Sequence, residues 1–295
     1  LIVMGLTPLI SAEWNWRVQL LIPAILSLIA TALAWRYFPE SPRWLESRGR
    51  YQEAEKVMRS IEEGVIRQTG KPLPPVVIAD DGKAPQAVPY SALLTGVLLK
   101  RVILGSCVLI AMNVVQYTLI NWLPTIFMTQ GINLKDSIVL NTMSMFGAPF
   151  GIFIAMLVMD KIPRKTMGVG LLILIAVLGY IYSLQTSMLL ITLIGFFLIT
   201  FVYMYVCYAS AVYVPEIWPT EAKLRGSGLA NAVGRISGIA APYAVAVLLS
   251  SYGVTGVFIL LGAVSIVVAI AIATIGIETK GVSVESLSID AVANK

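Results

Sequence analysis

The sequence predicts an all-α membrane protein, and three observations lead to that fold class. Apolar residues make up 58% of the 295-residue chain and charged residues only 13%, whereas an average soluble domain has roughly 45–50% and 25%. Apolar stretches recur that are long enough to cross a bilayer, since about 20 helical residues span its ~30 Å hydrocarbon core. Short polar segments carrying most of the charges separate these stretches. The alternation predicts a bundle of membrane-spanning helices.

Seven stretches have the length expected of a spanning helix. In chain order they are residues 18–38, 102–123, 138–159, 166–185, 188–213, 227–250 and 253–276. Residues 1–10 are apolar over only half a span and lack the basic flank of a signal peptide. We therefore expect a partial helix at residues 1–10 and a sequence that begins within a longer protein.

The long polar segment 39–100 is predicted to be a central loop in water. Pro39 and Pro42 end the preceding helix, because proline fixes φ and disfavours helix in the residue before it. Residues 50–68 alternate charged and apolar positions at helical spacing, which predicts one or two short amphipathic helices. Residues 71–89 contain five prolines and are predicted to form a loop. A polar tail, 278–295, follows the last span.

The basic residues orient the spans. Of 21 Lys and Arg, eleven lie within 36–101, three within 161–165, three within 223–235 and two in the tail, at Lys280 and Lys295. Only Arg17 and Lys135 fall in the alternate loops. By the positive-inside rule, we expect the first group of loops and the C-terminus to lie in the cytoplasm. Because the basic residues follow the loops, the expected partner is a lipid bilayer and not a nucleic acid.

Several enzyme classes are excluded by composition. The chain has no histidine, which excludes histidine metal sites and Ser-His or Cys-His nucleophilic pairs. It has no Walker-type phosphate loop. Cys107 and Cys207 both lie within spans, so a structural disulfide is not expected. We therefore predict no catalytic residues, no metal and no cofactor.

Four motifs then carry a family resemblance. They are PESPRWL at 39–45, NWLPT at 121–125, YVPEIWPT at 213–220 with LRG at 224–226, and ETKG at 278–281. In order and spacing they resemble the sugar-porter-type transporters of the major facilitator superfamily. There are three departures: Ile277 replaces a usual proline, Met156 stands where a glycine would fall, and in the loop DKIPRK at 160–165 Pro163 stands where glycine is usual. The proline at 163 puts the geometry of that turn in question.

The resemblance implies a fold and a function. The fold would be a major facilitator C-terminal six-helix bundle, residues 101–277, preceded by the sixth helix and part of the fifth. The likeness is strongest to the inner-membrane metabolite transporters of enteric bacteria, near the aromatic-acid and nicotinate proton symporters. The protein would be a secondary transporter, not an enzyme, and we expect a monomer.

Charged residues at the cytoplasmic ends of spans form the first candidate site. The resemblance implies that such residues pair when the cytoplasmic side is closed and separate when it opens; the set is Glu40, Arg43, Asp160, Arg164, Glu216, Arg225 and Glu278. Breaking several half-buried pairs would cost a few kcal/mol, enough to balance two states. The alternative for any one residue is a solvated charge that anchors a helix end.

Polar and aromatic stripes form the second candidate site. Asn113, Gln116, Tyr117 and Asn121 share one helical face, and amides facing lipid would be costly. This face should meet protein or a water-filled cavity that binds substrate, with Asn141 on the next helix. Tyr205 and Tyr208 are predicted to line the same cavity, because tyrosine hydroxyls in a membrane need partners. The alternatives are interhelical hydrogen bonding and simple packing.

Arg235 completes the candidate substrate site. It lies ~12 Å inside its predicted span at ~1.5 Å per residue, and an ionisable residue at that depth suggests function. Asn231 lies one turn away on the same face. A substrate carboxylate and a structural partner, such as Glu216, are equally acceptable partners for Arg235.

The function predicted from these observations is transport of a small organic solute by alternating access. An organic or aromatic carboxylate is the first choice of substrate, because of Arg235 and the tyrosines. A sugar or polyol is the second, because amides suit hydroxyls. The spans from 102 to 276 have one acid near their inner margin, Asp160, and none at mid-depth. A proton-carrying carboxylate must therefore lie elsewhere in the protein. A transport-inactive membrane protein is the remaining alternative.

Overall fold

The computed structural model describes residues 12–73, 89–129, 131–219 and 222–281. These residues form two compact units, one ending at Gly82 and the other beginning at Lys83, and each is described by itself. The predicted partial helix at 1–10, most of the loop at 71–89 and most of the tail lie outside the described residues. The described secondary structure is helical throughout, which confirms the all-α fold class.

The first unit contains one long apolar helix and two short polar ones. They are α2 (Ala12–Tyr37), α3 (Pro42–Ser47) and α4 (Tyr51–Thr69). The helix α2 ends just before Phe38 and Pro39, as the steric effect of proline on its predecessor requires. The segment predicted as one or two amphipathic helices forms the single helix α4. Its Ala54 is buried, as is Leu45 of α3, and α3 packs against α4.

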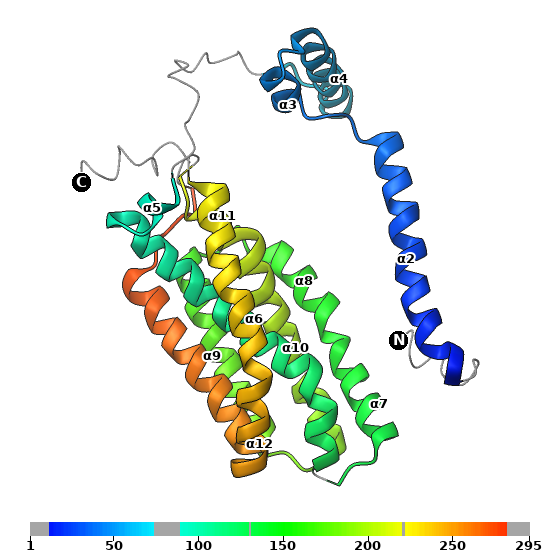
Figure 1. Cartoon of the computed structure of the whole chain (residues 1–295), viewed down its shortest axis with the longest axis vertical. Helices are drawn as coiled ribbons and strands as arrows, with labels where there is room; N and C mark the ends of the chain where they lie inside the picture. Colours follow the sequence, from blue (N-terminus) through cyan, green and yellow to red (C-terminus); the bar gives the residue numbers. More distant parts are fainter. Residues whose placement is uncertain (1–11, 74–88, 130, 220–221, 282–295) are drawn as a thin grey trace. The chain divides into compact units, whose positions relative to one another are not determined.

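The second unit is a bundle of helices that lie side by side (Figure 1). Its elements are α5 (Tyr90–Leu93), α6 (Gly96–Thr129), α7 (Leu134–Met145), α8 (Gly147–Val158), α9 (Arg164–Ser183), α10 (Met188–Val206), η1 (Cys207–Tyr213), α11 (Val214–Glu216) and α12 (Lys223–Ile275). The described residues contain six helical stretches long and apolar enough to cross a membrane, including one in the first unit. The last of them, 53 residues long, contains two spans, because Gly253 breaks it.

Gly253 makes the sharp turn between those two spans. Its φ of 65° and ψ of −159° lie in a region that is almost exclusive to glycine. A second irregularity, the π-helix η1, follows α10 directly. Such wider turns are rare and occur often at functional sites. Here η1 leads into the short helix α11, which ends at Glu216.

Close helix contacts hold the bundle together. The helix α12 packs against α6 and α9, and α10 packs against α8, α9 and α7. At the crossing of α8 and α10, a Cβ atom added to Gly151 would lie 2.2 Å from the backbone oxygen of Thr200. Small residues at such crossings let membrane helices approach closely. The spacing of α8 and α10 therefore depends on glycine at position 151.

We expect Gly151→Ala to destabilise the protein, because its new methyl group meets backbone and the two helices must separate. Overpacking of this kind costs about 1–3 kcal/mol. Gly262→Ala is the matched control, since nothing lies within 4 Å of a Cβ atom at that helical position. The melting temperature of the purified protein in detergent should fall for Gly151→Ala and not for Gly262→Ala. Equal melting temperatures for the two variants would contradict the close packing of α8 on α10.

Candidate functional site

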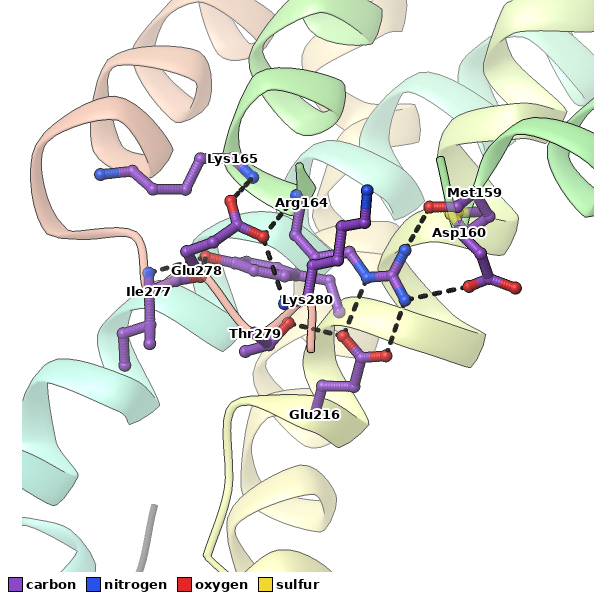
Figure 2. Close-up of polar contacts among 10 residues, drawn as sticks. Met159, Asp160, Arg164, Lys165, Glu216, Ile277, Glu278, Thr279 and Lys280 are labelled. Atoms are coloured by element: carbon purple, nitrogen blue, oxygen red, sulfur yellow. Dashed lines mark hydrogen bonds and ion pairs between the residues drawn. The ribbon is translucent and has the colours of Figure 1, made fainter. Parts of the chain in front are cut away.

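The first candidate site is built around Arg164, the first residue of α9 (Figure 2). Pro163 precedes it with a φ of −56° and a ψ of 139°. A φ near −65° is the value that proline imposes, so the proline found where glycine was expected fits this turn without strain. The chain enters α9 directly after Pro163, and the Arg164 side chain is only 7% exposed.

The guanidinium of Arg164 is surrounded by oxygen acceptors. Its Nε and Nη2 donate to the two carboxylate oxygens of Glu216 at 3.0 and 3.1 Å. Its Nη1 donates to the backbone oxygen of Met159, and Nη2 also donates to Asp160 Oδ1 at 3.3 Å. Bidentate pairing between arginine and a carboxylate fixes the relative orientation of the two groups and also compensates their charges. The arrangement joins the end of α8 and the start of α9 to α11.

Glu278 supplies the N-terminal cap of α9 from a distant part of the sequence. Its Oε1 accepts from the backbone N–H of Arg164 at 2.7 Å, and its Oε2 accepts from that of Lys165 at 3.2 Å. Pro163, at the cap position, offers no side-chain acceptor of its own. A carboxylate at a helix N-terminus satisfies exposed N–H groups and interacts favourably with the helix dipole.

The environment of Glu278 favours its ionised form. Partial burial opposes ionisation, but it is outweighed by the backbone N–H donors of Arg164, Lys165 and Lys280 and by the nearby Arg164 charge. Together they lower the pKa of the Glu278 carboxyl below its ordinary value. The carboxylate is therefore negative at neutral pH, as a helix cap requires.

The segment after α12 makes further hydrogen bonds to residues around Arg164. The hydroxyl of Thr279 donates to Glu216 Oε2 at 2.5 Å, and Lys280 Nζ donates to the backbone oxygen of Lys161 at 2.7 Å. Ile277 donates its N–H to Tyr213 Oη at 3.0 Å, and the Tyr213 hydroxyl is paired with the Ile277 carbonyl at 3.1 Å. Proline at position 277 could not donate, so the departure from the family motif at Ile277 provides a hydrogen bond. We call Asp160, Arg164, Glu216, Glu278 and Thr279 the Arg164 clamp.

The structure brings together four of the seven predicted gate charges, namely Asp160, Arg164, Glu216 and Glu278. Arg225 instead places its guanidinium over the ring of Tyr90, 5.2 Å from the centroid. Glu40 is exposed in the first unit, and the side chain of Arg43 lies outside the described residues. The pairing of Glu40 and Arg43 across the protein stays a prediction.

The second candidate site is an open cleft between α6 and α12. It has a volume of about 350 Å³ and is lined by Tyr117, Asn121, Arg235, Gly238 and Ile239. Nη1 of Arg235 donates to the Tyr117 hydroxyl at 2.7 Å. A Cβ atom on Gly238 would lie 3.1 Å from the Tyr117 ring, so glycine there gives the ring its place against α12. We call this feature the α6–α12 cleft.

The other predicted substrate residues take different positions. Asn113 is buried, and its amide donates to the backbone carbonyl of Leu109, one turn earlier in α6, at 2.7 Å. Asn231 is exposed, and its amide donates to the backbone carbonyl of Ser227 at 3.0 Å. Gln116 in α6 and Asn141 in α7 are half-buried. None of these four amides is among the residues that line the cleft. Their substrate role stays a prediction.

Tyr205 and Tyr208 lie inside the bundle, 1% and 0% exposed. The Tyr205 hydroxyl donates to the Val108 carbonyl of α6 at 3.2 Å. The Tyr208 ring stacks on that of Tyr213, with centroids 5.0 Å apart and an angle of 15° between planes. Neither residue is among those that line the α6–α12 cleft, and their role in substrate binding stays a prediction.

Comparison with known proteins places these features in context. The family described as "Sugar (and other) transporter" matches residues 1–291. The chain is 99% identical over 295 residues to the Escherichia coli K12 protein named "Putative metabolite transport protein YdjK", covering all of this chain and 64% of that protein. It is 45% identical over 279 residues to "Inner membrane metabolite transport protein YdjE" of the same organism, covering 94% of this chain and 62% of that one.

Solved structures give the same fold. Two structures of XylE, described as a proton:xylose symporter of the major facilitator superfamily, match with TM-scores of 0.69 and 0.61 at 18% and 22% identity. Each match covers 97% of this chain and 62% of the XylE chain. This likeness shows the major facilitator fold alone. The chain spans less than two thirds of the length of the relatives it matches.

Proposed function

The chain belongs to the family of sugar and other transporters within the major facilitator superfamily, and from this premise we propose that it is part of a proton-coupled carrier for a small organic carboxylate. The family consists of membrane transporters, so the protein is not an enzyme. In our proposal the full-length protein works as a monomer in the bacterial inner membrane, with its C-terminus in the cytoplasm. It would carry its substrate by alternating access.

One observation carries the choice of substrate, namely the position of the Arg235 guanidinium. Arg235 lies about 18 Å along α12 from its first residue, at ~1.5 Å per residue, and its side chain is exposed in the α6–α12 cleft. A cation at such depth in a membrane is costly and usually marks a substrate or ion pathway. A guanidinium has several N–H donors, so its contact with one phenol leaves donors for a carboxylate.

The Arg164 clamp supports alternating access. It holds the ends of α8 and α11, the start of α9 and the segment after α12 by a buried guanidinium and three carboxylates. A ligand shifts such an equilibrium only through its different affinities for the two states. We propose that the clamp is closed when the cavity faces outward and is broken when it faces the cytoplasm.

Proton coupling is proposed on indirect support. XylE, which has the same fold, is described as a proton symporter. The membrane-spanning sequence from 102 to 276 has no acid at mid-depth. A carboxylate that carries the proton would then belong to a part of the full-length protein outside this chain.

A sugar or polyol is the second candidate substrate. Asn121 lines the α6–α12 cleft, and its amide can both donate to and accept from hydroxyls. XylE has been solved with a bromodeoxyglucose, a neutral sugar analogue. A transport-inactive membrane protein is the remaining alternative, and it predicts no uptake of any solute.

The test is uptake of labelled carboxylates by cells that express the full-length protein. We expect Arg235→Ala to reduce carboxylate uptake by about a hundredfold or more, because loss of a charge-assisted pair costs about 3 kcal/mol. Gln116→Ala should reduce it less. Arg67→Ala, a change on the exposed surface of α4, is the matched control and should keep normal uptake. Carboxylate uptake unaffected by Arg235→Ala would contradict the proposed anchor.

A further inference from the structure

The α6–α12 cleft narrows the substrate class further. We infer that it is built for a carboxylate that carries several hydroxyl groups, such as a sugar acid, and not for an aromatic acid. The inference rests on the proposed function and concerns the same site. Three features carry it: the anion anchor, the polar groups beside it, and the position of the tyrosines.

The anchor favours an anion over a neutral sugar. The Arg235 guanidinium opens into the cleft and is held by one neutral acceptor, the Tyr117 hydroxyl at 2.7 Å. A phenol accepts a hydrogen bond but does not neutralise the charge. A cation placed within a membrane span is costly, and a carboxylate that pairs with it relieves that cost.

The neighbouring groups favour hydroxyls on the rest of the ligand. Because the Tyr117 oxygen accepts from Arg235, its own O–H remains able to donate to a ligand oxygen. Asn121 lies one turn further along α6 on the same side of the cleft, with Cβ atoms at i and i+4 about 6 Å apart. Its amide offers both donors and an acceptor. Hydroxyls on successive carbons next to the carboxylate can meet this row of polar groups.

The tyrosine positions argue against an aromatic ligand. Tyr205 and Tyr208 suggested an aromatic binding surface, but both are buried between helices. The Tyr117 ring packs against Gly238, which takes up one of its sides. Ile239 is then the large aliphatic side chain among the residues that line the cleft. A benzene ring placed there would leave the Asn121 amide without a polar partner, which costs affinity.

The experiment uses the full-length protein and four compounds: gluconate, hexanoate, benzoate and sorbitol. Each compound is tested as a competitor of labelled-carboxylate uptake by cells, and as a ligand in thermal-shift measurements on the purified protein. Gluconate and hexanoate have the same number of carbons and the same charge, so they isolate the hydroxyls. We expect gluconate to compete at least about tenfold better than hexanoate or benzoate, since one well-placed hydrogen bond is worth roughly that factor. Sorbitol, which lacks the carboxylate, should compete more weakly than gluconate.

The variant that tests the row of polar groups is Asn121→Leu. It should reduce the preference for gluconate over hexanoate by about tenfold. Gln185→Ala, which removes an amide at the far end of α9 that is bonded to Ile181, is the control and should keep the preference. If Asn121→Leu is not produced in folded form, the thermal shifts of the wild-type protein with the four compounds decide the question.

The outcomes distinguish a failure of the hydroxy-acid inference from a failure of the proposed carboxylate transport. Equal or better competition by hexanoate or benzoate, with uptake still dependent on Arg235, would overturn the hydroxy-acid inference and leave the carboxylate carrier standing. Competition by sorbitol with no response to any carboxylate would overturn both. Selective stabilisation by gluconate would support both.

Discussion

Replacing Arg164 by glutamine is expected to destabilise the protein by about 3 kcal/mol. Loss of one partner of a buried ion pair typically costs about 3–5 kcal/mol, and the lower value applies because Glu216 is one-third exposed. The variant leaves the Glu216 carboxylate and the Met159 carbonyl without their guanidinium donor. Denaturant unfolding of the purified full-length protein in detergent gives the free energy.

A double-mutant cycle with Glu216→Gln separates this pair from its surroundings. We expect the coupling free energy between Arg164 and Glu216 to be about 2 kcal/mol, because the pairing is bidentate and the arginine is buried. The pair Arg59–Glu55 on α4 is the matched comparison. Its side chains are 70% and 73% exposed, and an exposed i,i+4 pair contributes only about 0.3–0.5 kcal/mol. Similar coupling in both pairs would show that the clamp does not hold the bundle.

The same substitution should change transport through the balance of two states. In the proposed cycle, a weaker clamp lowers the cost of opening to the cytoplasm. Uptake by Arg164→Gln should then fall because the outward-facing state becomes rare, and substrate affinity measured from the outside should fall with it. Unchanged uptake in a folded variant would separate the clamp from the transport cycle.

The clamp was predictable in outline because the family resemblance implies that charges at one set of span ends pair with one another. Asp160, Arg164, Glu216 and Glu278 were predicted in this way, and the structure places them together. Thr279 was missed, since a single polar residue in a loop has no periodicity or charge to mark it. The partner of each predicted charge also depends on tertiary packing. Arg225, for example, lies over the ring of Tyr90.

For the polar and aromatic residues predicted to bind substrate, the contacts were harder to predict from the sequence. Tyr117 and Arg235 were both chosen, but their contact joins residues 118 positions apart in the sequence. Tyr205 and Tyr208 do lie together, with ring centroids 5.7 Å apart. They face the interior of the bundle, because the sequence spacing places two residues on one face but does not fix the direction in which that face points. The packing of the Tyr117 ring against Gly238 is a tertiary contact, so the sequence alone does not give it.

Glu278→Gln is expected to cost about 2 kcal/mol at neutral pH, since hydrogen bonds to charged groups contribute ~1.5–3 kcal/mol. The amide retains one oxygen acceptor, but its NH₂ group would face an N–H donor of Arg164 or Lys165. The start of α9 would lose its cap and the charge that complements its dipole. Glu63→Gln, on the exposed surface of α4, is the control and should unfold like the wild type.

Acid should reproduce that substitution in the wild-type protein. The pKa of Glu278 is lowered by the fold, so its ionised form stabilises the folded state at pH values above the ordinary pKa of 4.5. This contribution declines as the pH falls below 4.5 and is lost once the pH has passed the lowered pKa. The difference in unfolding free energy between wild type and Glu278→Gln should therefore be constant from pH 7 to about pH 5 and shrink on further acidification. A difference that stayed the same down to about pH 3 would show that the Glu278 charge does not cap α9.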